Sequence, residues 1–273
     1  MTMTTTPLSP AIGAEVEVDR DALLQDPAVP DAVLGALEAH GVLLFRGIGL
    51  DDEDQVAFGR RLGELVARPG YPIPEINVIT QDPANPMAEY LKGNAQWHID
   101  GALDRIPSKA GILTARVMSS SDSGTEFAST YAAYDDLSND ERAQLEGLRV
   151  MHSMEATLRG VVEDPTPQQL ASWRERSPYE HPLVWQHESG RRSLVIGATA
   201  DYIIDMDVDE GRALLADLVT RATRAERVVR HDWTVGDMVV WDNTGTLHRV
   251  TGHDPTSTRE LHRATVVGHE PIQ

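Results

Sequence analysis

The residues best suited to bind a metal ion are His98, Asp100 and His248. Two imidazoles and one carboxylate are the ligand set of the facial-triad Fe(II) site. His98 and Asp100 are two positions apart, so an extended segment presents both side chains on the same face. His248 must then be brought to them by a distant strand, for which a β barrel or sandwich is well suited. Three ligands on one face of an octahedron leave the opposite face open for a cosubstrate and oxygen.

A basic residue downstream of His248 strengthens this interpretation. An isolated His-x-Asp triplet is a weak signal, because a chain with 10 histidines and 43 acidic residues contains such triplets by chance. Arg259, however, follows His248 by eleven positions. A guanidinium can hold a carboxylate through two parallel hydrogen bonds, as a dicarboxylate cosubstrate beside an iron site requires.

With these residues in place, the chain resembles the taurine dioxygenase (TauD/TfdA) family of Fe(II)/2-oxoglutarate-dependent dioxygenases from about Gly13 to Gly268. That family has a His-x-Asp pair, a distal histidine and an arginine about ten to thirteen residues beyond it. Further matching segments have the sequences GVLLFRG, GNAQW, HPLV and WDN, and they begin at Gly41, Gly93, His181 and Trp241.

The resemblance implies roles for five residues. His98, Asp100 and His248 would be the iron ligands and the catalytic centre. Arg259 and Thr125 would bind the distal carboxylate of 2-oxoglutarate. The stretch before the threonine departs from the family, which usually has a Gly-Gly pair there, whereas this chain reads DSGT up to Thr125.

The strand expected around Leu261 to Val267 allows a check that does not depend on the family. With a period of two, Arg259, Leu261 and Arg263 share a face and His262 lies on the other. If Arg259 faces the iron, Arg263 lies on the same side. Arg263 would then bind an anion, either the substrate or the 1-carboxylate of 2-oxoglutarate, or it would simply pair with one of the many acidic residues.

Two further residues are candidates for substrate binding. Asn94 precedes His98 by four positions and matches a family position that touches substrate or cosubstrate; otherwise it is a turn residue. Tyr71 belongs to the loop RPGYP and either lines the pocket or is a surface aromatic.

Composition excludes several other classes of protein. The chain has 273 residues and no cysteine, which removes disulfide frameworks, cysteine-based zinc sites and cysteine nucleophiles. The formal charge of −19 disfavours nucleic acid and anionic membranes as partners. The N-terminal residues do not form a signal peptide, and no stretch has the ~20 apolar residues of a membrane span. We therefore expect a cytoplasmic protein, with no nucleic-acid or membrane partner, that forms a homo-oligomer (a dimer or tetramer).

The pattern of elements predicts one mainly β domain. We expect residues 1–12 to be a disordered or extended tail and residues 13–273 to form a single dioxygenase domain. Many short strands with few flanking helices indicate a jelly roll, that is, a cupin-like double-stranded β-helix. Residues 81–96 are predicted to be a loop, and a Ser-x-x-Glu capping box predicts a helix that begins after Ser138.

The sequence thus predicts an oxidoreductase that uses Fe(II), 2-oxoglutarate and O2 and releases succinate and CO2. Because halogenases of this type have a small residue where Asp100 stands, the resemblance favours hydroxylation, heteroatom cleavage or desaturation over halogenation. The substrate expected is a small molecule, either an anion or a natural-product intermediate. Two alternatives stay open: a jelly-roll metalloenzyme that does not use 2-oxoglutarate, and a non-catalytic ligand-binding barrel.

Overall fold

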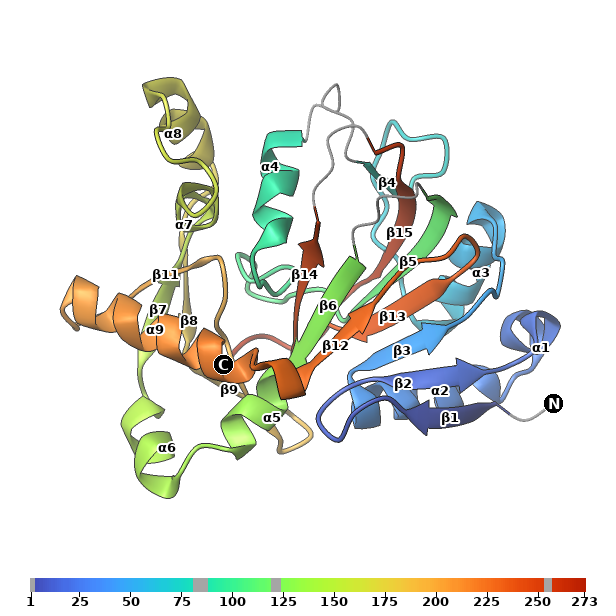
Figure 1. The fold of residues 1–273 in the computed structure, drawn as a ribbon, viewed down its shortest axis with the longest axis horizontal. Helices are drawn as coiled ribbons and strands as arrows, with labels where there is room; N and C mark the ends of the chain where they lie inside the picture. The colour runs from blue at the N-terminus through green and yellow to red at the C-terminus, as the bar shows by residue number, and fades with distance from the viewer. Residues whose placement is uncertain (1–2, 81–87, 119–123, 253–256) are drawn as a thin grey trace.

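The largest element is a seven-stranded sheet that crosses the molecule. The structure is a computed structural model that describes residues 3–80, 88–118, 124–252 and 257–273. The strands run in the order β1-β2-β3-β13-β5-β15-β4 (Figure 1). Their bounds are β1 (Thr4–Pro7), β2 (Ala14–Glu17), β3 (Val42–Phe45), β13 (Met238–Asp242), β5 (Ala110–Val117), β15 (Glu260–Val266) and β4 (Asn77–Thr80).

A second, three-stranded sheet faces the central strands of the first. It has the order β12-β6-β14, with β12 (Val228–His231), β6 (Gly124–Ser129) and β14 (Thr246–Thr251). Side chains from both sheets share one apolar cluster, in which Phe127 and Val229 meet Leu113, Val239 and Trp241. A mixed sheet and an antiparallel sheet around a common core form the jelly roll that the sequence predicts.

Apolar side chains of the central strands point alternately to the two faces of the seven-stranded sheet, so helices must cover its outer face. On β13, Val239 and Trp241 point into the core between the sheets, whereas Met238 and Val240 point to the other face. That outer face packs against α1 (Arg20–Gln25), α2 (Val29–His40) and α3 (Asp52–Leu62). A strand buried on both faces reads as a continuous apolar run, as VLLF does in β3.

Helices and small sheets also cover the outer face of the three-stranded sheet. Ala128 and Leu247 pack against Leu215 and Leu218 of α9 (Val208–Ala222). Nearby elements are α5 (Thr130–Asp135), α6 (Asn139–Leu145), η2 (Ala225–Arg227), the sheet β11 (Ala200–Ile203), β7 (Arg149–His152) and β8 (Tyr179–Pro182), and the hairpin β9 (Val184–Gln186) and β10 (Arg192–Leu194). Beyond this sheet, α7 (Met154–Arg159) and α8 (Pro167–Trp173) extend away from the barrel (Figure 1).

Several sequence predictions can be compared with these elements. The capping box is present, since Ser138 and Glu141 each bond the backbone of the other at the start of α6. The loop predicted over residues 81–96 is wrong in its second half, where α4 (Ala88–Lys92) and η1 (Gly93–Ala95) form; residues 81–87 lie outside the described part. The residues expected as an N-terminal tail include β1, which pairs antiparallel with β2.

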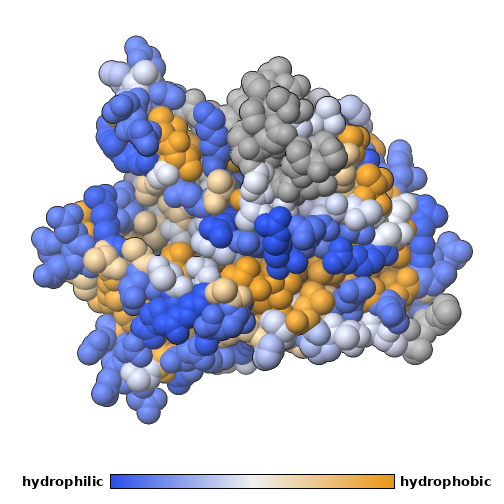
Figure 2. All heavy atoms as spheres, viewed as in Figure 1, coloured by the Kyte–Doolittle hydropathy of each residue, from blue (hydrophilic) through white to orange (hydrophobic). Residues whose placement is uncertain are grey.

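Figure 2 shows that α6 and α8 carry mostly hydrophilic side chains, as expected for a chain of charge −19.

Among the described helices, none is both long enough and apolar enough to cross a membrane.

Candidate functional site

The fold brings His98, Asp100 and His248 together in the open end of the barrel. His98 and His248 form an antiparallel bridge in which each backbone N–H donates to the carbonyl of the other, at 3.0 Å in both directions. One ligand atom from each of the three side chains lies within 4.8 Å of the others. His248 Nε2 lies 3.3 Å from Asp100 Oδ2, and His98 Nε2 lies 3.9 Å from Asp100 Oδ1. The grouping predicted from the sequence therefore forms in space.

A backbone contact fixes which nitrogen of His98 faces the cluster. His98 Nδ1 lies 2.8 Å from the carbonyl oxygen of Gln96, which can only accept a hydrogen bond. Nδ1 therefore carries the proton, and Nε2 presents a lone pair toward Asp100. Gln96 is itself held by α7, because its side-chain amide donates to the carbonyl of Thr157 at 2.6 Å. Orientation of a ligand imidazole by a carbonyl is a common feature of metal sites.

Charges around the cluster keep its carboxylate ionised and its imidazole neutral. Burial by itself raises the pKa of Asp100, but the Arg263 guanidinium and His248 outweigh this effect and hold that pKa well below its usual range. Burial lowers the pKa of His98 to about 4, and the neighbouring His248 lowers it further in the same direction. Asp100 and Nε2 of His98 therefore present lone pairs to the space between the three side chains.

Arg263 lies beside the triad, on the face that strand periodicity predicts. Its NH2 group is 3.0 Å from Asp100 Oδ2, and its guanidinium lies over the ring of Trp241 at 5.6 Å from the centroid. Its buried Nε has no hydrogen-bond partner among the described residues. His262 points the opposite way and contacts Asp52 of α3 at 2.6 Å. The alternation expected along this strand is confirmed.

Arg259 and Thr125, the two residues expected at the cosubstrate, lie in the same buried region. Arg259 precedes β15 and is 3% exposed, and Thr125 in β6 is 4% exposed. His231 pairs with Thr125 across the small sheet. Burial lowers the pKa of His231 to about 4, and the charges of Arg46 and Arg259 lower it further, whereas Asp237 and Asp232 oppose this effect.

Sequence reasoning missed Trp233, which fixes the hydroxyl of Thr125. Trp233 Nε1 donates to Thr125 Oγ1 at 2.9 Å, and both side chains are buried. Because the hydroxyl oxygen accepts from the indole, its single proton is free to be donated in another direction. The sequence holds no signal for this contact, since 108 positions separate the two residues.

The two candidate substrate residues, Asn94 and Tyr71, are less buried than Arg259 and Thr125. Asn94 lies in η1, which packs on β14, and it is partly buried. Tyr71 is 44% exposed in the loop before β4. The described contacts link neither side chain to the triad. Trp97 and Trp241, in contrast, are buried, as expected for residues that pack around the site.

A large cavity lies next to the triad rather than at it. It has a volume of about 710 Å³ and lies between α7, α9 and the segment that leads to His98. Arg249 forms part of its wall, stacked over the ring of Trp97 at 4.6 Å. Trp97 lines this cavity, whereas His98, Asp100 and His248 are not among its lining residues.

Comparison with known proteins gives a consistent result. The family model described as "Taurine catabolism dioxygenase TauD, TfdA family" matches residues 4–265. An alpha-ketoglutarate-dependent 2,4-dichlorophenoxyacetate dioxygenase from Burkholderia sp. (strain RASC) is 37% identical over 259 residues, which is 89% of this chain and 86% of that protein. An alpha-ketoglutarate-dependent sulfate ester dioxygenase from Pseudomonas putida is 32% identical and covers 97% of this chain and 90% of its own length.

A solved structure agrees with the sequence comparisons. The crystal structure of AAD-2 in complex with Mn(II) and N-oxalylglycine superposes with a TM-score of 0.85, at 33% identity and with all of both chains covered. This similarity confirms the jelly-roll fold.

Proposed function

This chain belongs to the TauD, TfdA family and is an Fe(II)- and 2-oxoglutarate-dependent dioxygenase, and we propose that it oxygenates a small organic anion. His98, Asp100 and His248 are the proposed iron ligands. One observation carries this assignment, namely that two imidazoles and one carboxylate converge within 4.8 Å, with the Nε2 lone pair of His98 facing the carboxylate. Two imidazole nitrogens and one carboxylate, with no thiolate, suit Fe(II).

The bound iron supplies the capacity to activate O2 at the expense of 2-oxoglutarate, which becomes succinate and CO2. The chain's own residues hold the reactants in place. Gln96 keeps the ring of His98 oriented, and Arg263 keeps Asp100 ionised. Trp97 and Trp241 exclude water from the back of the ligands, because both indoles are buried.

We assign the distal carboxylate of 2-oxoglutarate to Arg259 and Thr125. A buried guanidinium next to a threonine hydroxyl provides charge-assisted and neutral hydrogen bonds to one carboxylate. Trp233 supports this role, because its bond to Thr125 Oγ1 leaves the hydroxyl proton for the cosubstrate.

Arg263 is the proposed anion-binding residue nearest to the iron. One of its groups pairs with Asp100, and its buried Nε has no described hydrogen-bond partner. A buried guanidinium N–H without an acceptor is costly, and an anionic group of the substrate, or the 1-carboxylate of 2-oxoglutarate, would supply that acceptor. Asn94 and Tyr71 are retained as proposed substrate contacts.

The proposed substrate class is based on the guanidinium of Arg263 and on the substrates named for similar proteins. Proteins that resemble this chain are described as acting on 2,4-dichlorophenoxyacetate and on sulfate esters, both of which are organic anions with a carbon–oxygen bond next to a candidate C–H. We propose an aryloxy carboxylate or an alkyl sulfate ester as the substrate. Hydroxylation of the carbon that bears the oxygen gives a product that breaks its C–O bond and releases an alcohol or an inorganic anion. A cytoplasmic location and a homo-oligomeric state remain part of the proposal.

Substrate-stimulated release of succinate tests the proposal. The enzyme with Fe(II), 2-oxoglutarate and O2 is screened against aryloxy acids, sulfate esters, sulfonates and neutral analogues of the same size. We expect stimulation by anions and little by their amides or methyl esters. Arg263→Gln should weaken that preference for anions, whereas Arg249→Gln, in the cavity next to Trp97, should retain it. Equal stimulation by neutral analogues would contradict an anionic substrate.

A further inference from the structure

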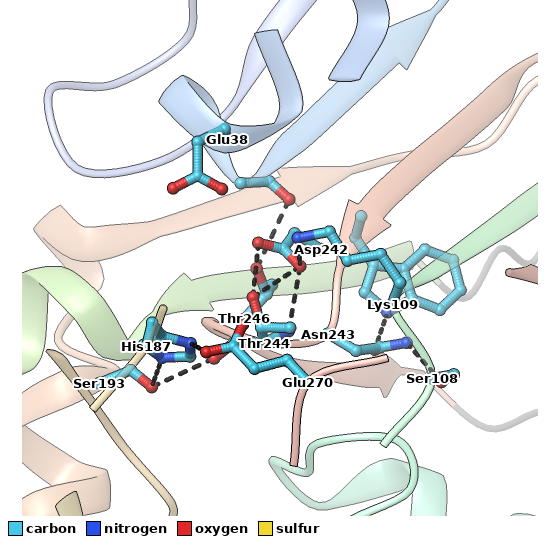
Figure 3. A network of polar contacts seen from close by, with 12 residues as sticks. Glu38, Ser108, Lys109, His187, Ser193, Asp242, Asn243, Thr244, Thr246 and Glu270 are labelled. Atoms are coloured by element: carbon cyan, nitrogen blue, oxygen red, sulfur yellow. Dashed lines mark hydrogen bonds and ion pairs between the residues drawn. The ribbon is translucent and has the colours of Figure 1, made fainter. Parts of the chain in front are cut away.

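A second cavity, with several acidic residues in its lining, lies between the outer helices and the C-terminal segment. It has a volume of about 650 Å³ and is lined by residues of α2, the end of α3, the β9–β10 hairpin and residues 266–270. Acidic side chains predominate among its charged residues, which are Glu38, Glu64, Lys109, Glu188 and Glu270. Figure 3 shows the polar contacts next to it, with His187 and Glu270 pointing toward each other.

Hydrogen-bond donors and acceptors define the state of His187. Ser193 Oγ donates its only proton to the carbonyl of Thr244 at 3.1 Å, so it accepts from His187 Nε2 at 2.8 Å. Burial lowers the pKa of His187 to about 4, and the charges of Lys109 and Arg191 lower it further. The ring is therefore neutral at pH 7, with its proton on Nε2 and a lone pair on Nδ1. The residue is 4% exposed, and Nδ1 has no hydrogen-bond partner among the described residues.

The group that faces this lone pair is a second acceptor. Glu270 Oε1 lies 3.5 Å from His187 Nδ1 and accepts the backbone N–H of Glu188 at 2.6 Å. A carboxylate oxygen and an imidazole lone pair repel each other unless a cation or a donor lies between them. The cavity next to them provides the space for one.

The distance between the two atoms discriminates among possible occupants. A charge-assisted hydrogen bond from a protonated ring would bring nitrogen and oxygen to about 2.7–2.9 Å. Two acceptors of one ammonium group, each about 2.9 Å from its nitrogen at the tetrahedral angle, lie about 4.7 Å apart. Two ligands of a tetrahedral zinc ion, at about 2.0–2.1 Å from the metal, lie about 3.4 Å apart. The observed 3.5 Å matches the metal and neither of the other two.

We propose that His187 Nδ1 and Glu270 are two ligands of a second metal site, separate from the iron centre, that takes a tetrahedral divalent ion of the zinc type. Water from the cavity completes the coordination sphere. Because Glu270 lies in the C-terminal segment and His187 in the β9–β10 hairpin, a bound ion joins these two parts of the fold. An ion that binds only the folded chain raises its melting temperature.

Zinc titration of four variants of the full chain tests this site. The His98→Ala background removes one of the proposed iron ligands, so that zinc bound there reports on the second site. We expect one zinc ion per chain in His98→Ala by calorimetry, and at least tenfold weaker binding when Glu270→Gln is added. Glu64→Gln in the same background removes a different acid from the same cavity and should bind zinc like His98→Ala alone. Glu270→Gln by itself should retain wild-type turnover with Fe(II).

The metal-free proteins provide a second measurement. A glutamine at position 270 still accepts from Glu188 N–H, and its amide can donate to His187 Nδ1. Glu270→Gln should therefore melt at the same temperature as wild type or higher without metal, yet lose the rise in melting temperature on addition of zinc. Zinc binding that is unaffected by Glu270→Gln, or a lower melting temperature of metal-free Glu270→Gln, would overturn the proposal.

Discussion

Two polar clusters lie at the two ends of the segment that joins β13 to β14, and they differ in their balance of donors and acceptors. At one end, buried Asp242 accepts from Lys109 Nζ at 3.1 Å and from the backbone N–H and the hydroxyl of Thr244 at 3.1 and 2.8 Å. At the other end, ligand atoms of His98, Asp100 and His248 lie within 4.8 Å of one another, and His98 Nε2 and Asp100 direct lone pairs at the space between them. The first cluster is complete with protein groups alone, and the second is complete only when a cation is bound.

This difference shows how burial can be used to separate structural from functional polar groups. A buried polar group costs free energy unless it is hydrogen-bonded, so a cluster in which donors match acceptors stabilises the fold. A cluster with surplus acceptors costs stability in the free chain and recovers it on binding metal. His187 and Glu270 lie close to the balanced cluster but share the surplus of acceptors, which is why they were singled out as a second metal site.

The largest effect is expected from removal of a ligand from the acceptor-rich cluster. His98→Ala should abolish turnover and the visible absorption that appears when Fe(II) and 2-oxoglutarate are added without oxygen. The physical reason is that two remaining ligands cannot fix the ion in a facial arrangement. Titration of the anaerobic protein measures the absorption, and an undiminished band in both His98→Ala and His248→Ala would show that the triad is wrongly assigned.

A smaller effect is expected from the cosubstrate anchor next to that cluster. Loss of a buried charge-assisted pair costs about 2–5 kcal/mol. Arg259→Ala should therefore raise the dissociation constant of 2-oxoglutarate at least tenfold, with iron binding retained. Arg263→Ala is the matched control, four residues further along the chain, within β15. A greater loss of 2-oxoglutarate affinity in Arg263→Ala than in Arg259→Ala would reverse the two roles.

A substitution in the cluster of Asp242, Lys109 and Thr244 should lower the stability of the fold and leave catalysis unchanged. Asp242→Asn leaves the ammonium of Lys109 and the hydroxyl of Thr244 without their anionic acceptor. We expect the free energy of unfolding to fall by about 1–3 kcal/mol, the cost of an unsatisfied buried donor. Urea denaturation gives this value, and turnover per folded molecule should be unchanged. Loss of turnover without loss of stability would remove the distinction between the clusters.

The pH dependence of stability tests the buried neutral histidines outside the triad. Burial lowers the pKa of His152 to about 3, with a contribution from the charge of His181, whose own pKa is lowered to about 4 mainly by burial. Because the unfolded chain binds a proton near pH 6.5 and the folded chain does not, stability falls as the pH decreases below 6.5. Between pH 7 and pH 5, one such histidine contributes about 2 kcal/mol to the fall.

His152→Gln removes one of these groups and should make the fall between pH 7 and pH 5 smaller by that amount. Glu141 and Glu155, whose pKa values are lowered to about 2 by their arginine partners, titrate below this range and do not interfere. Urea unfolding at both pH values measures the difference. An unchanged pH dependence in His152→Gln would indicate that His152 is already charged in the folded chain.

Much of the fold followed from local patterns in the sequence. The apolar run Val42–Phe45 is typical of the buried strand that it forms, and the Ser138 capping box predicted α6. The helical stretch around Asn94 was missed, because its Gly, Asn and Ala residues favour a turn and only packing of η1 against β14 selects the helical form. β7, β8 and β11 were also missed, since short half-exposed strands carry little periodicity of their own.

By itself, the sequence determined the types of the metal-binding side chains, their same-face spacing, and the side of the strand on which Arg259, Arg263 and His262 lie. These features depend on distances of a few residues, over which the period of a strand fixes direction. Only the tertiary structure decided which nitrogen of His98 carries the proton, that Arg263 pairs with Asp100, that Trp233 holds Thr125, and that His187 faces Glu270. The last three contacts join strands, loops and the C-terminal segment from distant parts of the chain. The position of the proton on His98 depends on the direction of one backbone carbonyl. A pattern of residue types contains no information about contacts between distant segments or about the direction of a carbonyl.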